Sequence, residues 1–159
     1  MRFEHYSDFV NTTNPRLALV WSATDSIDLK LLYASAFRAP SFLEMYEINN
    51  PASVGNPNLK PEKMRTIEAG LVWKLTHNYQ LSANLFHNRF TERIVQIAPL
   101  TMIAGGATIW GGEVELKADW QERLYGYLNY SFHTSKDNQT KVALADVAQH
   151  RIKVGSNVG

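Results

Sequence analysis

The chain has 159 residues, of which 45% are hydrophobic and only 19% are charged, a charged fraction below the roughly 25% of ordinary soluble domains. Sixteen basic and fifteen acidic residues leave a net charge of +1, which provides no clustered basic footprint for nucleic acid. The absence of cysteine excludes a disulfide framework and a thiolate metal site.

A period of two dominates the sequence, which is typical of strands with one apolar face. Between residues 27 and 37, for example, Ile27 and Leu31 fall on one face, whereas Asp28 and Lys30 fall on the other. The pattern predicts an all-β fold, an antiparallel up-and-down meander of about eight strands, with one short helical turn at 41–48. The predicted strand segments are residues 2–6, 17–21, 27–37, 66–74, 79–88, 114–120, 124–132 and 152–158.

Short and long connections alternate strictly between these segments. An up-and-down sheet whose tight turns all lie at one edge and whose long loops all lie at the other has this pattern, as bacterial outer-membrane barrels do. The predicted tight turns are 23–26, 75–78 and 121–123, and the predicted long loops are 7–13, 38–64, about 90–108, and 136–149.

Aromatic residues border the apolar face at both ends of the predicted strands. Trp21, Trp73 and Trp120 precede the three tight turns, and Tyr79 follows one of them. Near the long loops the same face carries Phe37, Trp110 and Phe132. Two aromatic rows around a band of aliphatic residues predict a membrane girdle, with outer-membrane lipid as the partner of this face.

The opposite face carries charges deep in the strands, which favours a wide water-filled lumen over a soluble β-sandwich. A sandwich also alternates, but it has no reason to place three tryptophans beside the short turns. The charged positions on this face are Asp28, Lys30, Glu68, Glu113, Glu115, Lys117 and Asp119.

Two sequence boxes at either end of the loop 38–64 resemble those of the TonB-dependent outer-membrane receptors, which import siderophores, haem and cobalamin. The stretch "AFRAPSF" is followed by "GNPNLKPEKMRTIEAGLVW", as a strand end, a loop and a returning strand are in that family. Most of these residues are expected to be architectural, since proline stops a ladder and sets turns. The matching residues are Phe37, Arg38, Ala39, Pro40 and Ser41 in the first box, and Asn56, Pro57, Leu59, Lys60, Pro61 and Glu62 in the second.

The resemblance implies a bacterial outer-membrane barrel of about 22 strands around a plug, of which this chain has only about eight strands. No plug domain and no TonB box are recognised, so TonB would be engaged only through N-terminal parts that this chain lacks. We therefore expect residues 1–159 to be an internal to C-terminal piece of a receptor barrel. As a partial transmembrane β-barrel it is expected to be an open, curved sheet with unpaired edges.

The resemblance also implies a transported metal chelate, and a ferric siderophore is the leading expectation. Haem receptors of the family place a histidine between the two boxes, and residues 41–55 contain none; haem and cobalamin remain alternatives. The candidate ligand-binding residues are Arg38, Glu44, Tyr46, Asn49 and Asn50.

Other functional classes find little support in the sequence. The five histidines are dispersed, so no metal site is predicted, and neither a catalytic signature nor a cofactor motif is recognised. Two alternatives stay open: a small, self-contained structural or adhesive outer-membrane barrel, and a soluble β-sandwich binding module.

Overall fold

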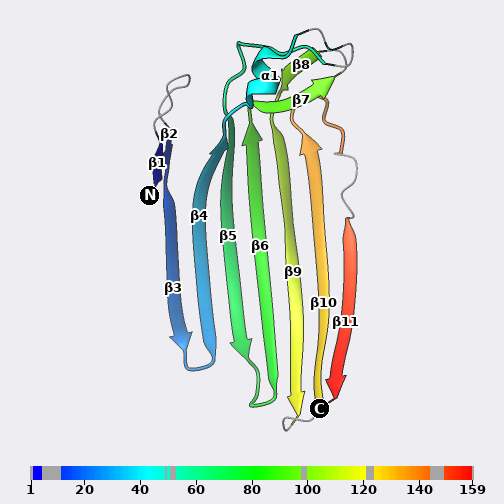
Figure 1. Ribbon diagram of the computed structural model, residues 1–159. Coiled ribbons are helices and arrows are strands. Elements are labelled where there is room, and N and C mark those ends of the chain that lie inside the picture. Colours follow the sequence, from blue (N-terminus) through cyan, green and yellow to red (C-terminus); the bar gives the residue numbers. More distant parts are fainter. Residues whose placement is uncertain are drawn as a thin grey trace.

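The strands lie side by side in one open antiparallel layer (Figure 1). The computed structural model describes residues 2–4, 12–48, 50, 53–97, 100–120, 124–143 and 149–158. Seven strands are paired in the order β11-β10-β9-β6-β5-β4-β3. They are β3 (Arg16–Thr24), β4 (Ile27–Arg38), β5 (Glu62–Lys74), β6 (Tyr79–Thr91), β9 (Ala107–Trp120), β10 (Leu124–Asp137) and β11 (His150–Val158).

The remaining elements lie at the edge and at one end of this sheet. Strand β1 (Arg2–Glu4) pairs with β2 (Thr12–Asn14), which leads through Pro15 into β3. The helix α1 (Phe42–Tyr46) and the hairpin β7 (Arg93–Ile97) and β8 (Leu100–Ala104) cluster at the end of the sheet that carries the long connections (Figure 1). The tight turns that the structure describes lie at the opposite end.

All eight predicted segments form strands, and the predicted open meander is confirmed. Residues 2–4 of segment 2–6 form strand β1, and the rest of the segment lies outside the described residues. In the described residues β1 pairs only with β2, which was not predicted because residues 12 and 13 were expected to be loop. The helical turn expected at 41–48 is α1. The hairpin β7–β8 was not predicted, since its residues were expected to be loop. Most of the expected loop at 7–13, and the tight turn at 121–123, lie outside the described residues.

Several predicted strand boundaries were wrong at the loop end. Strand β5 begins at Glu62 instead of residue 66, β9 begins at Ala107 instead of 114, and β10 ends at Asp137 instead of 132. The hydrogen-bonded ladder continues there although the apolar alternation has stopped. Backbone pairing needs no apolar face, so these strands extend beyond the alternating residues from which they were predicted.

The register assigns every paired residue to a face, because directly opposite residues of an antiparallel pair lie on the same side. We call the side that carries Trp21 the apolar face, and the other side the polar face. All four tryptophans lie on the apolar face, and each is 40–60% exposed. One row of residues that are directly opposite one another on the apolar face consists of Trp21, Leu29, Leu71, Ala83, Val114, Tyr130 and Ile152. We call such a row a register row.

No second layer covers the apolar face in the described part of the chain. Buried hydrophobic residues there number three, Met45, Leu59 and Ala107, and two of them lie in the loop that carries α1. The soluble sandwich would bury the tryptophans between two sheets, and the single layer does not do so. Within the described ranges, no helix is both long and apolar enough to cross a bilayer.

Aromatic contacts occur at both ends of the apolar face. Tyr79 meets Trp120 edge to face at a centroid distance of 5.5 Å. Trp110 and Phe132 meet in the same way at 5.6 Å. Both geometries are ones that aromatic pairs prefer, so the residues expected as a girdle pack in pairs across neighbouring strands.

Gly111 provides a test of how tightly β9 packs on its neighbours. A Cβ at Gly111 would collide with the carbonyl oxygen of Phe132 and lie 2.6 Å from the Cβ of His133. We expect Gly111→Ala to lower the free energy of unfolding by about 1–3 kcal/mol, measured by urea titration in micelles. Gly70→Ala is the control on the same face, because its Cβ would have ordinary contacts of 3.6 Å. Equal midpoints for the two variants would contradict the expectation.

Candidate functional site

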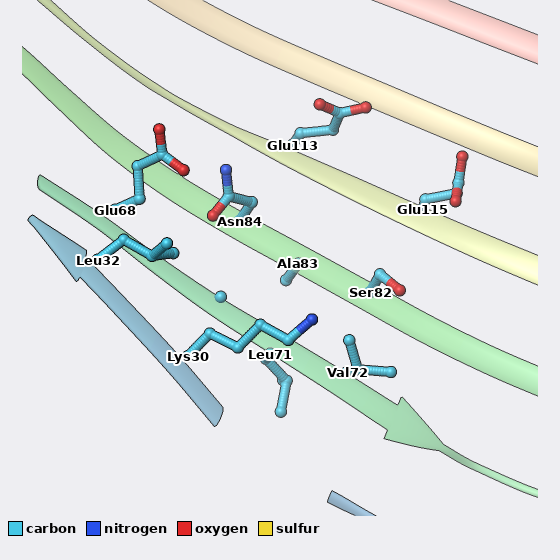
Figure 2. Close-up of a pocket in the computed structure, with 11 residues that line it drawn as sticks. Lys30, Leu32, Glu68, Leu71, Val72, Ser82, Ala83, Asn84, Glu113 and Glu115 are labelled. Carbon is cyan, nitrogen blue, oxygen red and sulfur yellow. The ribbon is translucent and has the colours of Figure 1, made fainter. Parts of the chain in front are cut away.

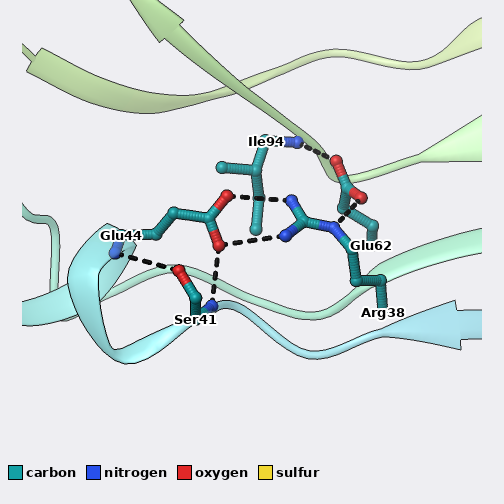
Figure 3. Close-up of polar contacts among 5 residues, drawn as sticks. All are labelled: Arg38, Ser41, Glu44, Glu62 and Ile94. Atoms are coloured by element: carbon teal, nitrogen blue, oxygen red, sulfur yellow. Dashed lines mark hydrogen bonds and ion pairs between the residues drawn. The ribbon is translucent and has the colours of Figure 1, made fainter.

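Arg38 joins four elements at the loop end of the sheet (Figure 3). It is the last residue of β4 and is paired in register with Glu62, the first residue of β5. Its Nε donates to Glu62 at 2.7 Å, and its two terminal nitrogens each donate to Glu44 of α1 at 3.0 Å. The other Glu62 oxygen accepts the backbone N–H of Ile94 in β7 at 2.5 Å. The guanidinium therefore holds the helix to the end of the sheet, and Glu62 links the hairpin to the same group.

The sequence around Ser41 explains why a helix begins there. The Ser41 hydroxyl accepts the backbone N–H of Glu44 at 3.2 Å, and the Glu44 carboxylate accepts the backbone N–H of Ser41 at 2.7 Å. This reciprocal pair is a capping box. Hydrogen bonds from Arg38, and then from Ser41, hold the pKa of Glu44 below its usual value. Glu44 thus stays ionised at a pH where an ordinary glutamate would be half protonated.

The second sequence box forms the turn that returns the chain to β5. Asn56 accepts the backbone N–H of Leu59 at 3.2 Å, with Pro57 at the second position of the turn, where proline is favoured. Its side chain also accepts the N–H of Asn58 at 3.0 Å. Leu59 is 4% exposed, and with Met45 it forms the small core of this loop. The box is therefore a folding unit as well as a sequence signature.

Gly55 is required because α1 and the turn touch backbone to backbone. A Cβ at Gly55 would lie 2.6 Å from the carbonyl oxygen of Met45. The Gly55 N–H donates to the Glu47 carbonyl at 2.9 Å, and the Asn56 N–H donates to the Glu44 carbonyl at 2.9 Å. These contacts hold α1 and the turn at 56–59 directly against each other.

The loop presents an apolar and aromatic surface next to polar groups. Phe42, Tyr46 and Ile48 are 76%, 47% and 77% exposed, and the rings of Phe42 and Tyr46 are 5.1 Å apart. Beside them, Glu47 accepts the side-chain amide of Asn50 at 2.7 Å. Hydrogen bonds from Ser53 and Asn50 lower the pKa of Glu47. The surface therefore combines two tilted rings, which contact each other, with a carboxylate, and we call it the α1 surface.

The polar face has a hollow lined by charged and amide side chains (Figure 2). Lys30, Glu68, Glu113 and Glu115 project into it from β4, β5 and β9, with Asn84 of β6 between them. Glu113 accepts the amide of Asn129 at 2.5 Å, and Glu115 pairs with Lys117 at 3.1 Å. Four of the seven charged residues that the sequence assigned to this side of the sheet therefore line the hollow.

The predicted ligand residues are not all free to meet a ligand. Arg38 and Glu44 are engaged with each other and with Glu62, which leaves two carboxylates against one guanidinium. Tyr46 is exposed, Asn50 is half-buried beside Glu47, and Asn49 lies outside the described residues. No ligand contact of any of the five is tested by this geometry.

Motif residues occupy the junction between β4, the loop and β5. Phe37 lies on the apolar face opposite Lys63. Pro40 is buried, and Ala39 and Pro61 are half-buried, whereas Lys60 is exposed. Sequence reasoning missed the contribution of Ile94 and of the exposed Phe42 and Ile48. For Phe42 and Ile48, the only signal in the sequence was an apolar residue type within an expected loop.

No group of three or more histidine or acidic side chains suitable for a metal ion occurs among the described residues. His77 lies in the connection between β5 and β6, whereas His87 lies on the apolar face of β6. Met45, whose thioether sulfur is another possible iron ligand, is the buried residue of α1 and is 5% exposed.

Comparison with protein families gives a match over almost the whole chain. The family model described as TonB dependent receptor-like, beta-barrel matches residues 1–158. The chain is 28% identical to heme/hemopexin utilization protein C of Haemophilus influenzae, over 99% of this chain and 28% of that protein. It is also 28% identical to the iron-regulated outer membrane virulence protein of Vibrio cholerae, over 79% of this chain and 20% of that protein.

Solved structures share the fold. The siderophore receptor PirA of Acinetobacter baumannii superposes with a TM-score of 0.79 at 21% identity, over 94% of this chain and 27% of that chain. The chain spans 28% or less of the lengths of the curated relatives named above. The likeness therefore concerns one portion of a larger barrel.

The Arg38 junction predicts a specific loss of order. We expect Arg38→Ala to speed amide exchange at Met45 and Glu47 about fivefold, because a half-exposed ion-pair network contributes up to about 1 kcal/mol. Hydrogen–deuterium exchange of the protein in micelles measures the effect. Lys60→Ala, which removes an exposed cation from the same loop, is expected to leave both rates unchanged. Unchanged exchange rates at Met45 and Glu47 in the Arg38→Ala variant would contradict the stabilising role of the Arg38 ion pairs.

Proposed function

Because the chain belongs to the TonB-dependent receptor family, we propose that it forms part of the barrel wall of a receptor that imports an iron chelate. Members of this family are bacterial outer-membrane β-barrel proteins and transport receptors. The sheet supplies seven neighbouring strands of such a wall, and its open edges β3 and β11 are positions where further strands pair. The loops at the α1 end then face the exterior, since external loops are the longer ones in these barrels.

The observation that carries the proposal is the ordered α1 surface at this external end. Ligand-binding residues are commonly placed on loops that a rigid scaffold holds in position. Arg38 of β4 bonds Glu44 in this loop and Glu62 of β5, and Glu62 in turn accepts the N–H of Ile94 in the hairpin. Phe42 and Tyr46 offer ring faces for an aromatic or apolar chelate. Glu47 and Asn50 offer hydrogen-bond acceptors and donors beside the rings. We propose Tyr46 and Asn50 as contact residues, together with Asn49.

A ferric siderophore is the proposed cargo. The siderophore receptor PirA has the same fold, and iron regulation is named for the Vibrio cholerae relative. The excess carboxylate at the Arg38 junction disfavours a strongly anionic chelate at that point. Arg38 is therefore proposed as a positioning residue for the loop, not as the ligand-binding residue expected from the sequence.

Haem is the second candidate, because the relative named for heme/hemopexin utilization covers 99% of this chain. No histidine lies between Ser41 and Gly55, and Met45 is buried. Tyr46 is exposed in this interval, and a tyrosine oxygen is a known axial ligand for haem iron. A Soret shift that Tyr46→Phe abolishes would therefore identify haem instead of a siderophore.

The apolar face is proposed to contact membrane lipid. Its tryptophans are exposed and no layer of the described chain covers them. Indole rings at the ends of an aliphatic band suit the boundary between hydrocarbon and head groups. The girdle residues on this assignment are Trp21, Trp73, Trp120, Tyr79, Trp110 and Phe132. Coupling to TonB is proposed to reach this wall through parts of the receptor outside this chain.

A double variant tests the ligand assignment. We expect Phe42→Ala with Tyr46→Ala to weaken binding of the transported chelate at least about tenfold, as loss of aromatic anchors typically does. Binding of an iron(III) catecholate, an iron(III) hydroxamate and haemin to the purified protein is measured by fluorescence titration. His77→Ala, in the tight turn at the other end of the sheet, is the control. Equal affinities for the double variant and this control would exclude the α1 surface.

Tryptophan quenching tests the lipid assignment. Variants that keep only Trp73 or only Trp110 in this chain are reconstituted in phosphatidylcholine brominated either near the head group or near the chain end. We expect stronger quenching by head-group-proximal bromine at both positions, because indoles prefer the interface. Quenching by aqueous acrylamide that exceeds quenching by either bromolipid would show that the face meets water.

A further inference from the structure

The segment that forms the α1 surface carries carboxylates and no cation. From Ser41 to Gly55 the chain contains Glu44 and Glu47 but neither lysine, arginine nor histidine. Both Glu44 oxygens accept hydrogen bonds from the Arg38 guanidinium at 3.0 Å (Figure 3). Glu47 takes part in none of the ion pairs of the described residues. The charge of Glu47 is therefore the one that a ligand on this surface meets.

Cations outside this segment do not supply the missing positive charge. Arg38 already donates to two carboxylates. Arg93, the first residue of β7, lies within electrostatic reach of Asp137. Lys60 is exposed and follows the turn at 56–59. An anionic ligand would thus meet a carboxylate on the α1 surface, and no cation of the segment itself would attract it.

Glu47 is held in place and favours its charged form. Its carboxylate accepts the side-chain amide of Asn50 at 2.7 Å. Hydrogen bonds from Ser53, and then from Asn50, lower the pKa of Glu47. A carboxylate has about four acceptor positions, so these two donors leave room for a third. An ammonium group, which carries a positive charge and three donors, suits the remaining positions.

The rings of Phe42 and Tyr46 suit the same kind of group. Their centroids are 5.1 Å apart and their planes are tilted by 49°. Both side chains are exposed, and the exposed Leu43 and Ile48 extend the apolar area around them. The face of an aromatic ring is negative and attracts a cation within about 6 Å of its centroid. The methylene groups that carry an ammonium can also lie along such an apolar surface.

We infer that the α1 surface selects a positively charged iron(III) chelate, and that Glu47 and the rings of Phe42 and Tyr46 recognise an alkylammonium group on it. The inference rests on the proposed function, because it concerns the charge of the ligand that this same surface binds. An iron(III) tris-hydroxamate is neutral, so a pendant ammonium makes the complex positive. An iron(III) tris-catecholate is triply negative, and the charge of Glu47 repels it. Glu47 is then a specificity-determining residue.

A matched pair of chelates tests this preference. The purified protein in micelles is titrated by fluorescence quenching with the iron(III) complex of a linear tris-hydroxamate that ends in an ammonium. The second ligand is the same complex with that amine acetylated. We expect the ammonium form to bind at least about threefold more tightly, since an exposed cation–π contact and an exposed ion pair each contribute up to about fivefold. An iron(III) tris-catecholate is expected to bind more weakly than either form.

Three variants assign the preference to residues. Glu47→Gln is expected to weaken binding of the ammonium form about threefold and to leave the acetylated form unchanged. Glu47→Lys is expected to reverse the order of the two forms. Phe42→Leu keeps an apolar side chain without a ring, and it is expected to weaken binding of the ammonium form about twofold more than that of the acetylated form.

Asp25→Asn is the control for the change in net charge. Asp25 lies in the tight turn between β3 and β4, at the opposite end of the sheet, so its replacement is expected to alter neither affinity. Equal affinities of the wild type for the two forms would overturn the inference, and so would equal effects of Glu47→Gln and Asp25→Asn. The comparison of the two forms needs no variant, so it holds even where a substitution disturbs the fold.

Failure of the inference can be told apart from failure of the proposed function. If Phe42→Ala with Tyr46→Ala weakens binding of both forms equally, and the wild type does not distinguish them, the α1 surface binds the chelate without regard to its charge. Only the preference is then rejected. If the wild type binds none of the three chelates, the inference and the proposed function are both rejected.

Discussion

The pairing register of a single antiparallel ladder is the constraint on which the rest of this structure depends. A conventional domain is stabilised by a core between two layers, but the described sheet buries only Ala107 among its hydrophobic strand residues. The ladder assigns residues to the two faces of the sheet. Because each row of paired residues lies wholly on one face, one face becomes mainly apolar and the other carries most of the charged residues. A shift of one residue would exchange the two sides. The separation of lipid-like from water-like chemistry is therefore a property of hydrogen bonding between backbones.

The same constraint explains how far sequence reasoning could go. Between the aromatic rows the alternation of apolar and polar residues is strong, so β3, β4, β6 and β11 could be found from it. Beyond the outer aromatic row, the pattern fails although pairing continues. Lys63 and Arg65 occupy apolar-face positions there, which is why β5 seemed to begin later than it does. The short hairpin β7–β8 lacks an apolar face of sufficient length and was taken as loop.

The α1 loop illustrates a different limit. Its two sequence boxes could be recognised as a family signature, and the capping residues Ser41 and Glu44 are spaced as a helix start requires. The bidentate contact from Arg38 and the bond from Ile94 to Glu62 join residues 6 and 32 positions apart. No local pattern encodes such contacts, so the sequence offered Arg38 as a ligand residue where the geometry gives it two carboxylate partners. The exposure of Phe42 likewise could be determined only from the folded structure.

The three tryptophans near the tight turns do not lie in the same register row. The row of Trp21 reaches Leu71, two residues short of Trp73, and the row of Trp73 reaches Leu116, four residues short of Trp120. The offset is six residues over four strand-to-strand steps. For the three indoles to share one depth, the strands must slant by about 45°. A strand with this slant is displaced along the wall by as much as it rises across it. The α1 loop at one end of β4 is therefore displaced sideways along the wall from the tight turn at the other end of β4.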